Sequence, residues 1–445
     1  MTPVWVVLPD PFSSRLFFDT GILEELRGRL GDRLALVLDE GEQEWAERAQ
    51  DVRVITRAEL IADDARIRKR IDEWLDAVAG FYPLSLRQTR RHGFNRERMQ
   101  SGHANWFLDP DRAGPLPSSE ILDRALTAWH YGRLRCVPRP LLDALRRERP
   151  VVALGNTQMH SVVPFVVGAH RARLPVVGHI ASWDHTVGKG IVPPRLRRYI
   201  VQNEVMRDDL VRYHDVQRDR VVVTGWPQTD VFHRRRPRGE FDDVVRGLGL
   251  DPARPVVLVM GNSPVNAPYE KNFVDRLVDW WETSGASARF SLLFRPHPRD
   301  REWRERFAAP RFREGAAVQE PSFTDLDTLA VLLQHGDVVV SNAGTILLDA
   351  LVNDRPAVCV LYDEGAPPGE SWALKNISGE HYKSLIESDA FYRAEDFDEV
   401  TAAIDRALAQ PAELAVERAR ASREVVGEID GRAAERVADA IATVA

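Results

Sequence analysis

Cysteine, lysine and long apolar runs are scarce in this chain of 445 residues. Its two cysteines, Cys136 and Cys359, are too few for a disulfide-stapled scaffold or a multi-cysteine zinc cluster, and they are typical of reduced thiols. No apolar run approaches the roughly 18 residues that a membrane-spanning helix needs. The N-terminal segment also lacks the basic and apolar regions of a signal peptide. These absences predict a cytoplasmic protein.

Basic residues are fewer than acidic residues, and almost all of the basic residues are arginine. The chain has 60 Lys and Arg residues against 67 Asp and Glu residues, and only five of the basic residues are lysine. A net charge of −7 argues against a general nucleic-acid partner. The arginines cluster at Arg87–Arg98, Arg195–Arg198 and Arg234–Arg238. Such clusters are typical of solvated faces, and the alternative is peripheral docking on anionic lipids at the inner face of the membrane.

The order of apolar runs predicts an α/β protein with more than one domain, since a domain has about 150 residues. Strand and helix patterns alternate before residue 64, are lost over residues 64–148 and resume from about residue 150. We therefore expect two doubly wound, Rossmann-like domains facing a cleft, with ligands at the carboxyl ends of the strands. The expected parts are an N-terminal domain (1–232), a helical insertion (about 64–148), an arginine-rich linker (233–241), a C-terminal domain (241–420) and one terminal helix (about 423–445) that packs back on the N-terminal domain.

The opening segment has a strand pattern that ends at a proline-rich turn. The run PVWVVLPD reads as a buried parallel strand, and Pro9, Asp10 and Pro11 predict a loop after it. A helix is expected from about Thr20, followed by the strand RLALVLDE.

The segment DVVVSNAGTILLDALVNDRP, residues 337–356, has the pattern of an anion site. A strand ends at Ser341 and Asn342, a small turn includes Gly344, and a helix begins near Thr345. Free N–H groups and the helix dipole at such a turn favour phosphate. Asp349, one turn along the helix, is placed to accept hydrogen bonds from ribose hydroxyls. The alternative is a plain turn in which Asn342 or Thr345 caps the helix.

Two further strand ends carry polar residues. The run LLFRPHPRD leads into Arg295 and His297, whose backbone is restrained by flanking prolines. Both side chains can donate hydrogen bonds to a diphosphate. The run VVLVMGNSPVN ends at a turn that would face the same phosphates, formed by Gly261, Asn262 and Ser263.

These motifs together resemble a known superfamily. VVVTGWPQTDVF, RPHP and SNAGTILLDALVNDRP are similar to segments of GT-B glycosyltransferases, whose relatives include sugar-nucleotide 2-epimerases and CDP-glycerol glycerophosphotransferases. HIASWDHTVGKG resembles a strand-end loop of bacterial surface-polysaccharide transferases. The resemblance covers roughly residues 150–400. It implies a nucleotide-diphosphate donor in the C-terminal domain, an acceptor in the N-terminal domain, and no metal or other cofactor.

By this resemblance, Ser341, Gly344 and Thr345 match the diphosphate turn, and Asp349 matches the ribose-binding acid. Arg295 and His297 match the basic pair near the phosphates. The loop QEPSF, residues 319–323 with Phe323, matches the one that holds the nucleobase. Ala343 stands where the 2-epimerases have a glycine, which counts against an epimerase. The triplet Asp325–Asp327 is better explained as charge at a helix start than as a metal site.

Transfer also needs a base that deprotonates the acceptor hydroxyl. Asp184 and His185 follow the strand VVGHI, and His160 follows the strand VVALGN, so these residues are the candidates for the base. The candidates for acceptor contacts are Lys189, Asp10 and Arg15. Loop capping or a solvated surface would equally account for each of them.

The pattern thus predicts a glycosyltransferase that moves a sugar from a nucleotide sugar to a hydroxyl of a surface glycan, a lipid-linked saccharide or a natural product. A CDP-glycerol-type glycerophosphotransferase would share the same motifs but attack phosphorus and release CMP. A sugar-nucleotide 2-epimerase, which needs no acceptor, and a non-catalytic protein that binds nucleotide sugars would also fit the pattern.

Overall fold

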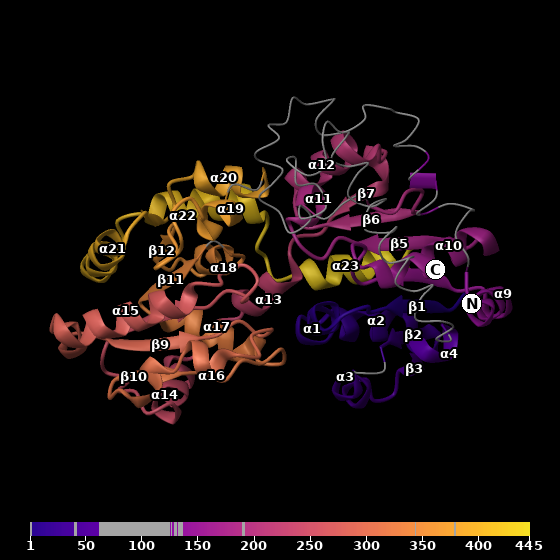
Figure 1. Ribbon diagram of the computed structural model, residues 1–445. Coiled ribbons are helices and arrows are strands. Elements are labelled where there is room, and N and C mark those ends of the chain that lie inside the picture. Colours follow the sequence, from indigo (N-terminus) through magenta and orange to yellow (C-terminus); the bar gives the residue numbers. More distant parts are fainter. Residues whose placement is uncertain are drawn as a thin grey trace. The chain divides into compact units, whose positions relative to one another are not determined.

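The computed structural model describes residues 2–39, 42–61, 125, 127–128, 131, 137–188, 192–342, 344–377 and 380–445 (Figure 1). Most of the insertion expected at 64–148 lies outside these ranges, as do the Arg87–Arg98 cluster and Lys189. The chain divides into two compact units. Unit 1 combines Met1–Asp230 with Gly427–Ala445, and unit 2 is Val231–Val426.

Unit 1 is built on a parallel sheet of seven strands in the order β3-β2-β1-β4-β5-β6-β7. Its strands are short apolar runs, and several, such as β1, are buried along their whole length. Their bounds are β1 (Val4–Val7), β2 (Leu34–Leu38), β3 (Arg53–Thr56), β4 (Val151–Leu154), β5 (Val176–His179), β6 (Arg198–Val201) and β7 (Val221–Val223). The helices are α1 (Pro11–Asp19), α2 (Ile22–Leu30), α3 (Gln43–Arg48), α4 (Arg57–Leu60), α9 (Arg139–Glu148), α10 (Val163–Ala172), α11 (His185–Gly188), α12 (Glu204–His214) and α23 (Ala433–Ala442), with α13 (Pro227–His233) at the boundary.

Unit 2 repeats the architecture with six parallel strands in the order β10-β9-β8-β11-β12-β13. The strands are β8 (Val256–Met260), β9 (Ser291–Arg295), β10 (Ala316–Val318), β11 (Val338–Asn342), β12 (Ala357–Val360) and β13 (Tyr392–Ala394). The helices are α14 (Arg238–Gly247), α15 (Glu270–Thr283), α16 (Trp303–Arg306), α17 (Leu326–His335), α18 (Ile346–Val352), α19 (Trp372–Ile377), α20 (Lys383–Ile386), α21 (Phe397–Ala409) and α22 (Ala415–Ala421). Val257 and Val259 of β8 pack with the apolar face of α15 in the core.

Both sheets have the doubly wound order, so the predicted fold class is confirmed. The strand order reverses between β1 and β4 in unit 1 and between β8 and β11 in unit 2. Ligands of such sheets bind at the carboxyl ends of the strands beside this reversal. Among the residues that the structure describes, none of the helices combines the length and apolar character needed to cross a bilayer.

The loop expected after the first strand is instead the helix α1. Pro11 is its first residue, where a missing N–H and a fixed φ suit a helix start. Asp10 is the N-cap and accepts a hydrogen bond from the Ser13 N–H at 2.7 Å. The expectation of a loop up to Thr20 was wrong because proline and aspartate also form this start signal.

The arginine-rich segment 233–241, expected as a linker, belongs to unit 2. Gln334 of α17 donates to the carbonyl oxygens of Phe232 and Arg234, each at 2.9 Å. Its Oε1 accepts the N–H of Arg236 at 2.8 Å. These contacts hold the segment along α17.

The C-terminal segment is not the single helix expected from about residue 423. It forms a π-helical turn at Ser422–Val426, breaks, and begins again as α23 at Ala433. Gly427 and Gly431 have φ of 101° and 75°, which end a right-handed helix. The apolar spacing continued through the glycines, but their backbone conformation interrupts the helix.

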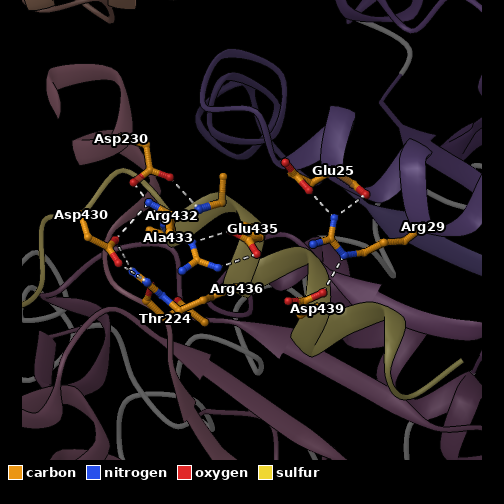
Figure 2. A network of polar contacts seen from close by, with 11 residues as sticks. Glu25, Arg29, Thr224, Asp230, Asp430, Arg432, Ala433, Glu435, Arg436 and Asp439 are labelled. Atoms are coloured by element: carbon orange, nitrogen blue, oxygen red, sulfur yellow. Dashed lines mark hydrogen bonds and ion pairs between the residues drawn. The ribbon is translucent and has the colours of Figure 1, made fainter. Parts of the chain in front are cut away.

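Polar contacts fasten α23 to the rest of unit 1, as Figure 2 shows. The Asp230 carboxylate accepts the N–H groups of Ala433 at 3.1 Å and Ala434 at 2.8 Å. Arg29 of α2 pairs with Asp439 at 2.6 Å. Val437 and Ile441, 0% and 1% exposed, face the core of the same unit.

We expect Asp230→Ala to lower the free energy of unfolding by about 1–2 kcal/mol, as for loss of an N-cap. The substitution leaves two N–H groups at the start of α23 without their acceptor. Equilibrium urea denaturation measures the effect. Asp243→Ala is the matched control because its side chain is 80% exposed. Equal stability of both variants would contradict the capping role.

Candidate functional site

Three turns meet at the strand-order reversal of unit 2. They carry the residues that the sequence predicts for donor binding, and we call them the donor half-site. They follow β8, β9 and β11. The Gly261 N–H donates to the carbonyl oxygen of Arg295 at 2.9 Å, which joins the first two turns. The Ser341 hydroxyl donates to the carbonyl oxygen of Met260 at 2.8 Å, which joins the third. The structure thus brings together the three motifs that the sequence singled out in this domain.

Gly261 is required by the closeness of these turns. A Cβ at this position would lie 2.9 Å from Phe307 Cζ and 3.2 Å from Pro296 Cα. Gly344 is different, because a Cβ there would meet Asn262 Nδ2 at an ordinary 3.7 Å. That distance also places the β11 turn beside the β8 turn. Ser263 belongs to the same turn and donates its N–H to Asn262 Oδ1 at 2.8 Å.

His297 is half-buried in the turn after β9, and its ring has a defined role there. Nδ1 accepts the N–H of Arg299 at 3.1 Å. A neutral imidazole that accepts at Nδ1 carries its proton on Nε2. The turn therefore presents an N–H donor of the kind that binds an anion.

Arg295 is held more tightly than the sequence indicates. Its guanidinium forms a bidentate pair with Asp325, both contacts at 2.8 Å, and donates to Gln319 Oε1 at 2.5 Å. The residue is 7% exposed. Arg295 thus ties β9 to the start of α17 and to the 319–323 loop, and a direct phosphate contact by it stays a prediction. Phe323 lies half-buried in that loop.

The remaining residues that the sequence predicts for donor binding lie on and before α18. Thr345, the residue before the helix, is exposed, and Asp349 is 4% exposed on the helix itself. A pocket at this edge of the sheet is lined in part by Met260, Tyr269, Glu270, Ser341, Asn342 and Tyr362. Ser341 and Asn342 therefore line the pocket together with residues that the sequence did not indicate.

In unit 1, Asp184 and His185 lie where the chain leaves β5. Asp184 Oδ1 accepts the Ser182 hydroxyl at 2.5 Å and lies 3.9 Å from His185 Nε2. The side chain of His185 is 11% exposed. The two residues that the sequence proposes as the base therefore lie side by side at this end of β5.

The loop around this pair is anchored on both sides. Gln158, from the loop after β4, donates to the carbonyl oxygen of His185 at 3.2 Å. His214 of α12 contacts the carbonyl oxygen of Thr186 through Nε2 at 2.7 Å and accepts the Val192 N–H through Nδ1 at 3.0 Å. His160 begins a short 3-10 helix, and its side chain lies outside the described part.

Asp10 and Arg15 have structural partners. Besides capping α1, Asp10 accepts the Asn156 side-chain N–H at 2.9 Å and is 6% exposed. Arg15 donates to Gln228 Oε1 at 3.0 Å. The capping interpretation of Asp10 thus holds in the structure, and an acceptor contact by either residue stays a prediction.

Glu42 was missed by the sequence analysis, although it lies next to Asp10. It is 6% exposed and accepts the hydroxyl of Ser14. Its Oε1 has no hydrogen-bond partner among the residues that the structure describes. Burial, with smaller contributions from Asp10 and Asp39, raises the pKa of Glu42 to about 7, while the Ser14 hydrogen bond lowers it. No local pattern marks this residue, because its burial depends on the packing of α1 against the segment before α3.

The chain matches the model of a known family. Residues 194–443 match the model described as "CDP-Glycerol:Poly(glycerophosphate) glycerophosphotransferase". The matched segment contains all three turns of the donor half-site and ends within the C-terminal tail. A sequence search of curated proteins finds no match.

Solved structures with the same arrangement of elements are distant in sequence. The UDP-GlcNAc 2-epimerase of Neisseria meningitidis bound to UDP-GlcNAc is 10% identical, with 99% of each chain covered and a TM-score of 0.56. MnaA of S. aureus with UDP is 10% identical over 98% of this chain and 95% of that one, with a TM-score of 0.55. A glycosyltransferase of Rickettsia africae is 9% identical over 99% and 98%, with a TM-score of 0.51. The predicted GT-B fold is confirmed.

Proposed function

Because the chain belongs to the CDP-glycerol:poly(glycerophosphate) glycerophosphotransferase family, we propose that it transfers a phosphate-linked polyol from a CDP-activated donor to a hydroxyl of a surface polymer. The sequence motifs alone favour glycosyl transfer, and the family match favours transfer at phosphorus instead. The single observation that carries this choice is the match over residues 194–443, which spans the whole donor half-site.

The donor half-site offers complementary groups for such a donor. The His297 Nε2–H and the turn containing Ser341, Gly344 and Thr345 suit the diphosphate, because they present hydrogen-bond donors to an anion. Asp349 suits the ribose hydroxyls as an acceptor. The loop with Phe323 suits the cytosine ring. We assign to His297 the stabilisation of the negative charge that develops on the leaving phosphate. Because this hydrogen-bond donor takes the role that a metal ion would otherwise have, the proposal includes no metal.

In the proposed reaction, the acceptor hydroxyl oxygen attacks the phosphorus that carries the polyol. The bond from that phosphorus to the bridging oxygen breaks, and CMP leaves with the electron pair. The hydroxyl proton passes to His185, where the Asp184 carboxylate at 3.9 Å stabilises the imidazolium. One phosphodiester bond forms as one phosphoanhydride bond breaks.

A nucleotide panel tests the donor assignment. We expect CDP and CMP to raise the melting temperature by a few degrees, because a ligand present at 100 times its Kd stabilises the folded state by about 2.7 kcal/mol. UDP, GDP and dTDP are expected to have little effect, and Mg²⁺ none. A shift with UDP or GDP alone would support glycosyl transfer instead. No shift with any nucleotide would contradict the donor half-site.

A further inference from the structure

A buried ionic cluster lies directly behind two turns of the donor half-site. Arg306, the last residue of α16, is 6% exposed. Its guanidinium donates to Asp300 Oδ2 at 2.6 Å and to Glu270 Oε2 at 2.8 Å. It also donates to the carbonyl oxygen of Ala267 at 2.8 Å. Arg306 therefore joins the start of α15 to the loop after β9.

Each acidic residue of this cluster contacts one of the turns, Glu270 through its carboxylate and Asp300 through its backbone N–H. Glu270 Oε1 accepts the N–H of Asn262, in the β8 turn, at 2.7 Å. Asp300 donates its N–H to the carbonyl oxygen of His297, in the β9 turn, at 2.8 Å. A continuous series of polar contacts, with Arg306 at its centre, therefore joins Asn262 to His297.

Because the cluster is charged and buried, a contribution to the stability of the fold does not fully explain its presence. One guanidinium faces two carboxylates, and the side chains of Arg306, Glu270 and Asp300 are 8%, 8% and 0% exposed. Burial raises the pKa of Glu270 to about 7, and Arg306 acts in the opposite direction. The desolvation of such groups offsets much of their mutual attraction, whereas their directional contacts still define a geometry.

We propose that Arg306 is a positioning residue for the diphosphate of the donor, an inference that rests on the proposed function. It holds the Asn262 turn and the His297 turn at the separation that two adjacent phosphate groups need. The fit around Gly261 supports this role, because a Cβ there would lie 3.3 Å from Glu270 Oε2 as well as 3.2 Å from Pro296 Cα. Arg306 acts through the two turns and does not touch the donor.

The test compares Arg306→Met with wild type in two measurements, CDP affinity by calorimetry and steady-state transfer from CDP-glycerol. We expect the Kd for CDP and the KM for CDP-glycerol to rise about tenfold, with kcat within about threefold. Arg306→Lys keeps the charge and is expected to recover part of the affinity. Arg246→Met, on α14 and with a side chain 60% exposed, is the control and is expected to bind CDP like wild type.

The outcomes separate this inference from the proposed function. If wild type binds CDP and folded Arg306→Met binds it equally well, the positioning role is overturned while the function stands. A loss of kcat with unchanged Kd and KM overturns it too. If wild type binds no CDP, both proposals fall. Should Arg306→Met fail to fold, Asp300→Asn, which weakens the anchor of Arg306 outside the pocket lining, replaces it, with the same rise in Kd and KM expected.

Discussion

Replacement of His185 by asparagine is expected to lower transfer by about 10²-fold or more, with the affinity for CDP unchanged, because proton transfer by a positioned base contributes 10²–10⁴-fold. His185 lies in unit 1, and the groups assigned to the donor lie in unit 2. The substitution therefore removes the proton acceptor and leaves the nucleotide contacts in place. Steady-state rates and CDP calorimetry on the same preparations measure the two effects separately.

The control for this prediction is His233→Asn, since His233 is exposed at the end of α13. Asp184→Asn is the informative companion. If Asp184 only stabilises the imidazolium, its loss lowers transfer less than the loss of His185. If Asp184 is itself the base, its loss has the larger effect. Wild-type turnover in both variants would leave His160 as the candidate for the base.

The second large effect is expected at Asp349. Asp349→Asn should weaken CDP binding by about 1–3 kcal/mol, as for loss of a hydrogen bond to a charged group. The residue is 4% exposed on α18, just beyond the β11 turn, and asparagine keeps its size while removing the charge. Calorimetric titration with CDP measures the change.

Asp327→Asn provides the matched control, because that side chain is 71% exposed at the start of α17 and pairs with Arg236. It is expected to bind CDP like wild type. Equal affinities of both variants would remove Asp349 from the ribose assignment. A melting temperature recorded without ligand separates a binding effect from unfolding of α18.

Local residue order was enough to specify β8, β9 and β11 and the turns that follow them. A run such as Val256–Met260 is apolar throughout, so it can only be a strand covered on both faces or a buried helix segment, and the glycine after it excludes a longer helix. Parallel strands place their carboxyl ends on one edge. The sequence therefore places Gly261, His297 and Ser341 at one edge, and the strand order of the folded sheet makes their turns neighbours.

Only tertiary packing decided which polar side chains form ion pairs and hydrogen bonds with one another. The sequence alone predicts that Arg295 is available to bind phosphate. In the structure its guanidinium pairs with Asp325, which lies 30 residues later in the chain. Arg306 and Glu42 give no local signal, because their burial depends on elements brought together by the fold. The break before α23 follows from Gly427 and Gly431, but the acceptor that restarts the helix is Asp230, about 200 residues earlier. Periodicity reports the burial of apolar side chains, whereas the pairing of charges depends on distances that no local pattern contains.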